Sequence, residues 1–227
     1  TIHHLDILKA LGSYIAVALE NSTIHEEVNT LNTLLVREKR ELESANRKIA
    51  HMANHDNLTG LPNRRLLYEL VGQAMPQARR QKQMFALFYI DLDNFKPIND
   101  ELGHDYGDEV LKIVADRLTH VLRKSDTVAR IGGDEFVTII GDVRSMEQLE
   151  KVAEKTIRSL EPPITVRGIH RELGMSIGIS IFPEDAETFE DLLKKADDAL
   201  YTVKESGKNG YCFFKRGDQG RQCTHLD

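Results

Sequence analysis

Residues 84–90 read MFALFYI, and acidic residues follow at positions 91 and 93. A continuous apolar run of this length, rich in aromatic residues, predicts a buried strand. A carboxylate at the end of such a strand costs free energy unless it meets a metal ion or a partner of opposite charge. The stretch therefore predicts a strand that delivers Asp91 and Asp93 to one edge of a sheet.

Helices and strands alternate on both sides of this strand. We predict helices over residues 64–80, 145–160 and 189–204, with Ser145 as a cap, and a helix that Asp105 caps and that buries apolar positions between 110 and 118. We predict strands over residues 126–130, 136–140, 175–181 and 211–214, and a small hairpin over 164–173. The Gly132-Gly133 pair predicts a hairpin turn, because both glycines can take a positive φ. This order predicts a ferredoxin-like α+β sheet with helices on one side.

The N-terminal quarter of the chain has the pattern of long helices. Leu8, Leu11, Ile15 and Leu19 form one apolar stripe, which predicts the last helix of a sensor domain, weakly similar to the GAF type. From position 24 to position 52, apolar residues recur in alternating steps of four and three, with Glu38 as the exception. A sustained heptad repeat predicts a coiled coil, and we expect a parallel homodimer that is weakened at Glu38. The alternative is a single helix that lies on the globular domain.

The composition narrows the class of protein. The chain has 227 residues, 41% hydrophobic and 29% charged, with a net charge of −6, so a nucleic-acid partner is not expected. No apolar stretch near the start is long enough to span a bilayer, and no secretory leader is evident. Because the chain begins with Thr1, we expect a fragment of a longer protein. We expect Cys212 and Cys223 to be reduced thiols, with one disulfide as the alternative.

A second acidic pair, Asp134-Glu135, follows the glycine turn directly. If this hairpin lies beside the strand that carries Asp91 and Asp93, three or four carboxylates converge at one edge of the sheet. Such hard oxygen ligands suit Mg²⁺, which shares its coordination shell with water and substrate phosphates. Either acidic motif alone is more typical of solvated loop residues.

Four motifs in order carry a resemblance to a known family. Residues 132–136 read GGDEF, and residues 56–65 read DNLTGLPNRR. Residues 91–100 read DLDNFKPIND, and Gly103-His104 and Gly107-Asp108 follow them. Residues 199–209 read ALYTVKESGKN. Over residues 56–214 the sequence resembles the GGDEF family of diguanylate cyclases. The resemblance implies a nucleotidyl-cyclase-like fold, in which a central antiparallel sheet is flanked by helices and preceded by a long coiled-coil helix. We expect the end of a sensor domain at 1–22, a signalling coiled coil at 23–55, the cyclase domain at 56–215 and a flexible tail at 216–227.

The family implies a reaction in which two domains, each with one GTP, face each other. Each 3′-hydroxyl attacks the α-phosphate of the other GTP, which gives cyclic di-GMP and two pyrophosphates. By resemblance, Asp91, Asp134, Glu135 and the backbone carbonyl of Leu92 hold two Mg²⁺ ions per site, or Mn²⁺ in their place. Glu135 is expected to assist deprotonation of the 3′-hydroxyl or to hold the second metal ion.

The resemblance also assigns substrate contacts. Asn99 and Asp108 match the guanine-binding positions. A carboxylate can accept hydrogen bonds from the pair of N–H groups on the Watson–Crick edge of guanine, and adenine has no such pair. Lys204 and Lys208, at i and i+4, are expected to point the same way toward the triphosphate, although many members have Arg in place of Lys208. The remaining substrate-binding positions are Phe95, Lys96, Gly132 and Gly133. A side chain at either glycine would obstruct the nucleotide.

Arg123 and Asp126 form an Arg-x-x-Asp set, which the family uses as an inhibitory site for its own product. We therefore expect feedback inhibition by cyclic di-GMP, an upstream sensor domain as a partner and, from the family, a bacterial cytoplasmic location. Two alternatives remain: a catalytically silent module that binds GTP or cyclic di-GMP, and a dimer that mainly relays a signal through its coiled coil. The intact Asp134-Glu135 pair argues against the silent module.

Overall fold

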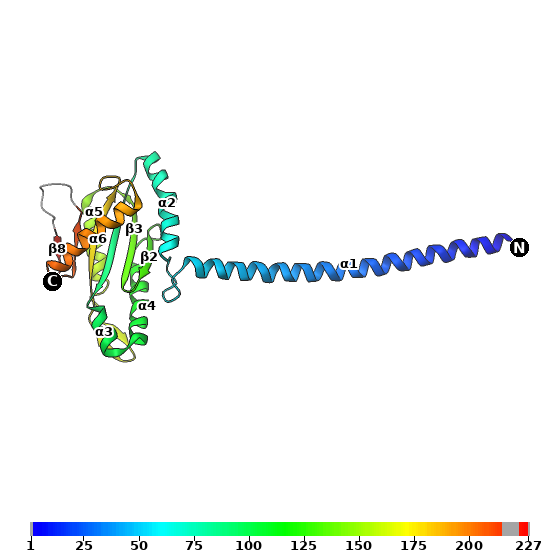
Figure 1. The fold of residues 1–227 in the computed structure, drawn as a ribbon, viewed down its shortest axis with the longest axis horizontal. Helices are drawn as coiled ribbons and strands as arrows, with labels where there is room; N and C mark the ends of the chain where they lie inside the picture. The colour runs from blue at the N-terminus through cyan, green and yellow to red at the C-terminus, as the bar shows by residue number, and fades with distance from the viewer. Residues whose placement is uncertain (1, 215–222, 227) are drawn as a thin grey trace. The chain divides into compact units, whose positions relative to one another are not determined.

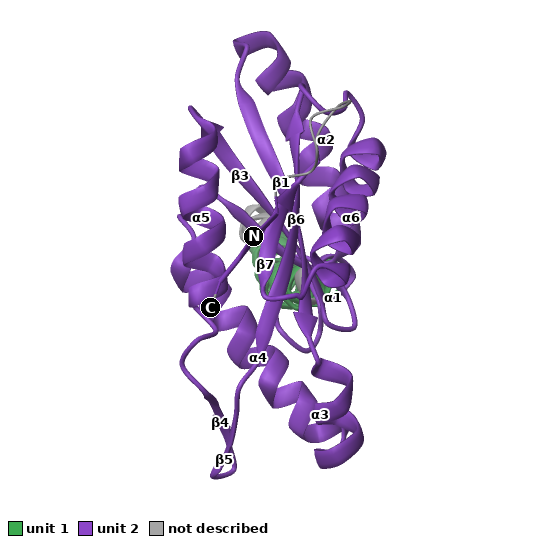
Figure 2. Cartoon of the chain, turned by 90° about the vertical axis from the view of Figure 1, so that its left-hand side faces the viewer, with its two compact units in different colours: residues 1–51 green, residues 52–227 purple. Residues whose placement is uncertain are grey.

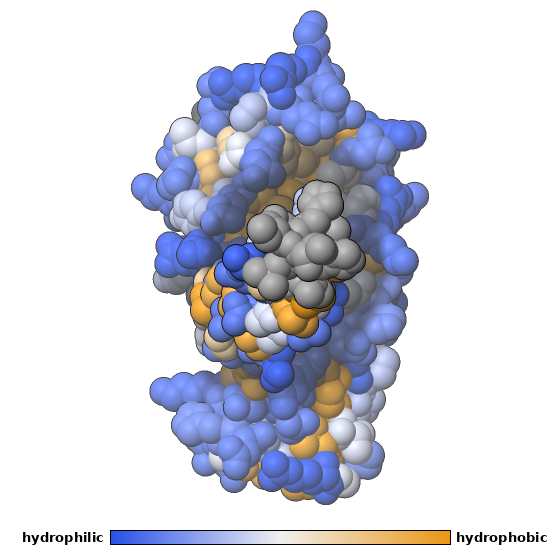
Figure 3. All heavy atoms as spheres, turned by 90° about the vertical axis from the view of Figure 1, so that its right-hand side faces the viewer, coloured by the Kyte–Doolittle hydropathy of each residue, from blue (hydrophilic) through white to orange (hydrophobic). Residues whose placement is uncertain are grey.

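The computed structural model describes residues 2–214 and 223–226, and the chain divides into two compact units, residues 1–51 and 52–227. The first unit consists of most of α1 (Ile2–Asn54), one continuous helix that shows no break at the expected boundary between residues 22 and 23. Its heptad seam is exposed: Ile24, Leu35 and Leu42 are 50%, 62% and 64% exposed. Figure 3 shows apolar and polar side chains side by side on this helix. None of the described helices is long and apolar enough to cross a membrane.

The second unit is built on a six-stranded sheet with the strand order β2-β3-β1-β6-β7-β8 (Figure 1). The strands are β1 (Met84–Asp93), β2 (Thr127–Gly132), β3 (Glu135–Val143), β6 (Gly174–Phe182), β7 (Gly210–Phe213) and β8 (Cys223–His225). All neighbours pair antiparallel except β6 and β7, which are parallel, so the sheet is mixed. A separate hairpin pairs β4 (Ile164–Val166) with β5 (Ile169–Arg171). The expected α+β sheet is confirmed.

Helices cover both faces of the sheet, so the expectation of helices on one side is wrong (Figure 2). The helices are α2 (Arg64–Gln81), α3 (Phe95–Leu102), α4 (His104–Val121), α5 (Met146–Arg158) and α6 (Phe189–Glu205). Because side chains alternate along a strand, Phe88 and Ile90 of β1 join the core under α4 and α5, whereas Leu87 joins the core under α2 and α6. The order of helices and strands along the sequence does not show whether the helices cover one face of the sheet or both.

The helix boundaries follow from local capping. Asn63 and Ser145 accept hydrogen bonds from the backbone N–H groups of Leu66 and Gln148, and thereby cap α2 and α5. The expected cap at Asp105 is wrong, because α4 begins at His104, with Gly103 as the capping residue and no side-chain cap. Sequence analysis missed α3, whose short sequence contains Pro97 near its start, a position that tolerates proline.

Part of the expected tail is ordered. Residues 223–225 form β8, and Cys212 and Cys223 form a disulfide, so the expectation of reduced thiols is wrong. The two cysteines lie opposite each other in the β7–β8 register, which explains why they meet. Residues 216–222 and 227 of the expected tail, and residue 215 of the expected cyclase domain, lie outside the described residues.

Candidate active site

The antiparallel register of β1 and β3 places two of the predicted acidic residues opposite each other. Asp91 pairs with Glu135, because the hairpin returns beside the end of β1. The turn lies at Gly133-Asp134 rather than at Gly132-Gly133, since Gly132 still pairs with Glu135. Both glycines have a positive φ, 154° and 50°, which explains the residue type. No protein atom lies within 4 Å of a Cβ added at either one, so conformation rather than protein packing requires these glycines.

Asp91 lies inside β1 rather than at its end, and α6 supplies its positive partner. Lys204 Nζ lies 2.8 Å from Asp91 Oδ2, and the Asp91 side chain is 14% exposed. Burial raises the pKa of the Asp91 carboxyl, and the negative charges of Asp134 and Asp93 raise it further, whereas the hydrogen bond from Lys204 opposes them. The charged form of Asp91 is therefore disfavoured by burial and by its acidic neighbours, and a cation stabilises it.

Glu135 is held by a residue that sequence analysis did not select. Tyr89 and Glu135 are diagonal neighbours on one face of the β1–β3 pair, and the Tyr89 hydroxyl donates a hydrogen bond to the Glu135 carboxylate. Burial raises the pKa of Glu135, this hydrogen bond lowers it, and three acidic neighbours raise it further: Asp91, Asp134 and Asp197. Burial also raises the pKa of Tyr89 far above its usual range, so the hydroxyl keeps its proton at neutral pH.

The predicted metal ligands fit a hard divalent cation by their chemistry. Within the described residues, no three His, Cys, Asp or Glu side chains are grouped closely enough to hold an ion by themselves. Mg²⁺ commonly takes only one or two carboxylates, because water and substrate phosphates complete its shell. Asp91 and Asp134, with the backbone carbonyl of Leu92, can provide this smaller set. Burial is the main cause of the raised pKa of Asp91, and the negative charges of Asp134 and Asp93 add to it.

Asp93, the second acid of the Asp-x-Asp motif, has a structural environment. Its side chain is buried and accepts a hydrogen bond from Ser176 Oγ at 2.8 Å and one from the Asn209 backbone N–H at 2.9 Å. The expected convergence of acids is therefore reduced by one, because both oxygens of Asp93 are bonded to the protein. A buried carboxylate is tolerated when hydrogen bonds compensate its desolvation.

The predicted guanine-binding positions lie where α3 and α4 meet. A Cβ on Gly107 would lie only 1.8 Å from Asn99 Oδ1 and 3.2 Å from Phe95 Cζ, so this glycine makes room for both side chains. Asp108 is exposed, as is Lys96, whereas Phe95 is buried. The carboxylate of Asp108 is thus available to a ligand.

The two predicted phosphate-binding lysines do not share a helix face. The helix α6 ends at Glu205, and Lys208 lies beyond it with a left-handed φ of 64°. Lys208 Nζ donates to Asn94 Oδ1 at 2.8 Å, whereas Lys204 contacts Asp91. The i, i+4 expectation is therefore wrong, although both ammonium groups contact residues at the end of β1 or directly after it.

Arg130 is a second residue that sequence analysis missed. Its Nη1 lies 2.9 Å from Asp56 Oδ1, and its Nε and Nη2 donate to the Gly133 carbonyl at 3.0 and 2.7 Å. Asp56 also accepts hydrogen bonds from the backbone N–H and the hydroxyl of Thr59. One guanidinium group therefore connects the opening motif of the domain to the glycine turn between β2 and β3. An arginine two residues before the glycine pair was the only signal in the sequence.

The Arg-x-x-Asp set lies beside a separate pocket of about 400 Å³. The Asp126 carboxylate accepts a hydrogen bond from the Arg123 backbone N–H at 3.0 Å, which leaves the Arg123 guanidinium exposed. Lys151 and Lys155, from α5, line the same pocket. The pocket thus combines three cationic side chains with two carboxylates, those of Asp126 and Glu147, which can accept hydrogen bonds from a base.

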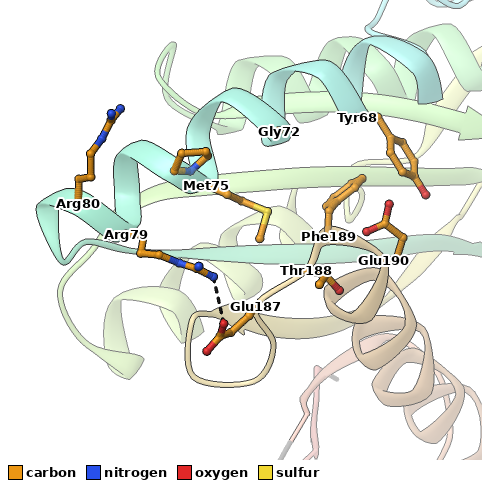
Figure 4. Close-up of a pocket in the computed structure, with 10 residues that line it drawn as sticks. Tyr68, Gly72, Met75, Arg79, Arg80, Glu187, Thr188, Phe189 and Glu190 are labelled. Carbon is orange, nitrogen blue, oxygen red and sulfur yellow. Dashed lines mark hydrogen bonds and ion pairs between the residues drawn. The ribbon is translucent and has the colours of Figure 1, made fainter.

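A further pocket of about 590 Å³ lies between α2 and the start of α6 (Figure 4). Tyr68, Met75 and Phe189 line it, and an ion pair between Arg79 and Glu187 crosses its rim at 3.1 Å. None of the predicted site residues lines this pocket. It is therefore separate from the acidic edge of the sheet, which we define as Asp91, Asp134 and Glu135.

The fold and the acidic edge define a domain of the nucleotidyl-cyclase type. Residues 53–210 match the family described as "Diguanylate cyclase, GGDEF domain", and the chain belongs to this family. The chain is 40% identical over 201 residues to the bifunctional diguanylate cyclase/cyclic di-GMP phosphodiesterase MucR of Pseudomonas aeruginosa, covering 88% of this chain and 29% of that protein. It is 38% identical over 190 residues to the diguanylate cyclase TpbB of the same organism, covering 83% of this chain and 44% of that protein.

A solved structure of TpbB that comprises only the GGDEF domain superposes with a TM-score of 0.69 at 38% identity, covering 71% of this chain and 94% of that one. The chain spans less than half the length of MucR and of TpbB. The comparison therefore bears on the GGDEF domain and not on the other parts of those proteins.

Proposed function

We propose that this chain is an active diguanylate cyclase that condenses two molecules of GTP into cyclic di-GMP and releases two pyrophosphates. The acidic edge at the β1–β3 register carries this proposal, because Asp91 pairs there with Glu135, Lys204 contacts Asp91, and the charge of Asp134 acts on Asp91. The family membership supports the same reaction.

Each residue has a role in this proposal. Asn99 and Asp108 bind the guanine edge, and Lys204 and Lys208 bind the phosphates. Phe95, Lys96, Gly132 and Gly133 are the remaining substrate-binding positions. Glu135, whose pKa burial raises, accepts the proton of the attacking 3′-hydroxyl.

The metal ions would be held by Asp91, Asp134 and the Leu92 carbonyl, with Glu135 as the alternative ligand of the second ion. Bound Mg²⁺ would neutralise charge on the phosphates and orient the α-phosphate for in-line attack. When GTP binds, Lys204 exchanges its ion pair with Asp91 for an ion pair with the phosphates.

The reaction needs two domains that face each other, so the active form is a homodimer. The exposed heptad seam of α1 supports a coiled coil as the means of pairing. We further propose that cyclic di-GMP inhibits the enzyme at Arg123 and Asp126, where Lys151 and Lys155 add positive charge for its phosphates.

Product formation from GTP with Mg²⁺, resolved by chromatography, tests the proposal. The parent chain should form cyclic di-GMP, and Asp134→Ala and Glu135→Ala should each form less by at least about a hundredfold, as when an electrostatic or general-base group is removed. Asp116→Ala, at an exposed acid on α4, is the matched control and should keep parental activity. A dimer that binds GTP and forms no product would contradict the proposal.

A further inference from the structure

The loop that carries Lys208 is held by a strand beyond the part of the chain that matches the family. The match ends at residue 210, and β8 begins at Cys223. β8 pairs with β7 and covers an edge that would otherwise expose unpaired backbone groups. A Cβ on Gly210 would lie 2.3 Å from the Thr224 carbonyl oxygen, so the two backbones approach closely at this point.

Three contacts connect β8 and Leu226 to the residues just before β7. The Leu226 N–H donates to the Asn209 carbonyl at 3.0 Å, and Asn209 Nδ2 donates to the Leu226 carbonyl at 2.9 Å. The ring Nδ1 of His225 lies 2.8 Å from the Lys208 carbonyl. These contacts hold a two-residue segment in which Lys208 and Asn209 both have a left-handed φ, 64° and 46°. A lysine is costly in this conformation, so surrounding contacts must maintain it.

The same segment continues into the active site. The Asn209 N–H donates to buried Asp93 at 2.9 Å, and Lys208 Nζ donates to Asn94 at 2.8 Å. The position of the Lys208 ammonium group is therefore set from one side by the end of β1 and from the other side by β8.

The Cys212–Cys223 disulfide fastens β8 to the sheet. Cys212 is fully buried, whereas Cys223 is half-buried, so the sulfur that a thiol reagent reaches first is that of Cys223. These are the only two cysteines of the chain, so this bond is the single target for a thiol reagent.

We propose that β8 is a redox-sensitive strap that positions Lys208 for the phosphates of GTP. This inference rests on the proposed function for the identity of the ligand. Reduction opens the strap by ordinary thiol–disulfide exchange with a dithiol. A thiolate of the dithiol attacks Cys223 Sγ, and the Cys212 sulfur leaves and takes up a proton. The second thiol of the reagent then releases Cys223 as a thiol while the reagent becomes a cyclic disulfide.

The test compares the oxidised chain, the chain reduced with dithiothreitol and the Cys223→Ser variant, with the disulfide state verified by mass spectrometry. The first readout is the affinity for a non-hydrolysable GTP analogue. If the reduced Lys208 segment holds its binding conformation a fifth of the time, the affinity falls about fivefold. Cys223→Ser should show the lower affinity both with and without dithiothreitol, because it has no disulfide to reduce.

The second readout is hydrogen exchange over residues 209–213, which needs no nucleotide. We expect faster exchange in the reduced chain and in Cys223→Ser than in the oxidised chain. Equal exchange in all three forms would overturn the proposal, as would a chain that fails to form the disulfide under oxidising conditions. Faster exchange without a change in analogue affinity would also overturn it, because β8 would then not position Lys208. If the chain binds no GTP in any form, the proposed function and the role of β8 toward GTP are both refuted. A difference in exchange would then show only that reduction loosens β8.

Discussion

Replacement of Arg130 by methionine should both destabilise the domain and disturb the glycine turn between β2 and β3. The guanidinium group donates three hydrogen bonds, one to Asp56 and two to the Gly133 carbonyl. The side chains of Arg130 and Asp56 are only 11% and 24% exposed. Methionine retains an unbranched apolar stem of similar length, so the loss is mainly that of the charged head group.

The magnitude follows from what the substitution leaves behind. Breaking a buried ion pair from one side costs about 3–5 kcal/mol, because the remaining charge stays buried. Asp56 keeps two hydrogen bonds from Thr59 and is partly exposed, so we expect a value near the lower end, about 3 kcal/mol. In a domain of this size, such a loss lowers the Tm by about 6–12 °C.

The effect should also depend on pH. Burial alone would raise the pKa of Asp56, but the hydrogen bonds from Thr59 and Arg130 outweigh it and lower the pKa. A lowered carboxyl pKa contributes stability above the unfolded-state value of about 3.9, and that stability is lost as the pH falls through the folded-state pKa. The difference in Tm between parent and Arg130→Met should therefore be largest near neutral pH and shrink below about pH 4.

Differential scanning calorimetry between pH 3 and pH 7 measures this difference. The matched control is Arg65→Met, which also removes a guanidinium group bonded to a residue of another element, Asn54 at the end of α1, but at a side chain that is 60% exposed. We expect the control to cost less than about 1 kcal/mol, as is usual at exposed positions. If Arg130→Met loses no more Tm than this control, or loses the same amount at every pH, the reasoning is refuted.

Two further predictions concern the two ends of the site. In Tyr89→Phe, Glu135 loses its hydrogen-bond donor, its pKa should rise, and the acidic limb of the pH profile of product formation should move to higher pH; an unmoved limb would contradict this. In Gly107→Ala, the added Cβ would displace the Asn99 side chain, so the KM for GTP should rise about tenfold, as overpacking typically costs about 1–3 kcal/mol. Gly72→Ala, with open space around its Cβ, should leave the KM unchanged.

Much of the fold could be predicted because its signals are local. The apolar run at 84–90, the caps at Asn63 and Ser145 and the glycine turn each depend on neighbours within a few residues. The sheet face on which a helix packs depends instead on contacts across the chain. The sequence at 84–90 shows only a continuous apolar run, whereas in the structure Phe88 and Leu87 point into two different cores.

In the candidate site, too, local sequence signals predict some features, whereas others depend on contacts across the chain. The Asp-x-Asp motif places Asp91 and Asp93 on the same face of β1, and no pattern in it separates their roles. Asp93 is engaged because Ser176 and Asn209, more than 80 residues away in sequence, bond both of its oxygens. Asp91 pairs with Lys204 through Oδ2, and within the described part of the chain its other oxygen receives no hydrogen bond from Lys204. Only the tertiary structure decides which of two equivalent acids remains available.

The supports of the acidic edge come from different elements and act on different atoms. Lys204 of α6 pairs with Asp91, and Tyr89 of β1 donates to Glu135. Arg130 of β2 donates to the Gly133 carbonyl in the turn between β2 and β3. A site that collects negative charge before its substrate arrives needs such supports, because repulsion would otherwise push the carboxylates apart or protonate them. None of these three groups belongs to the GGDEF motif itself. The GGDEF motif supplies Asp134 and Glu135, β1 supplies Asp91, and the surrounding fold keeps these acids in place.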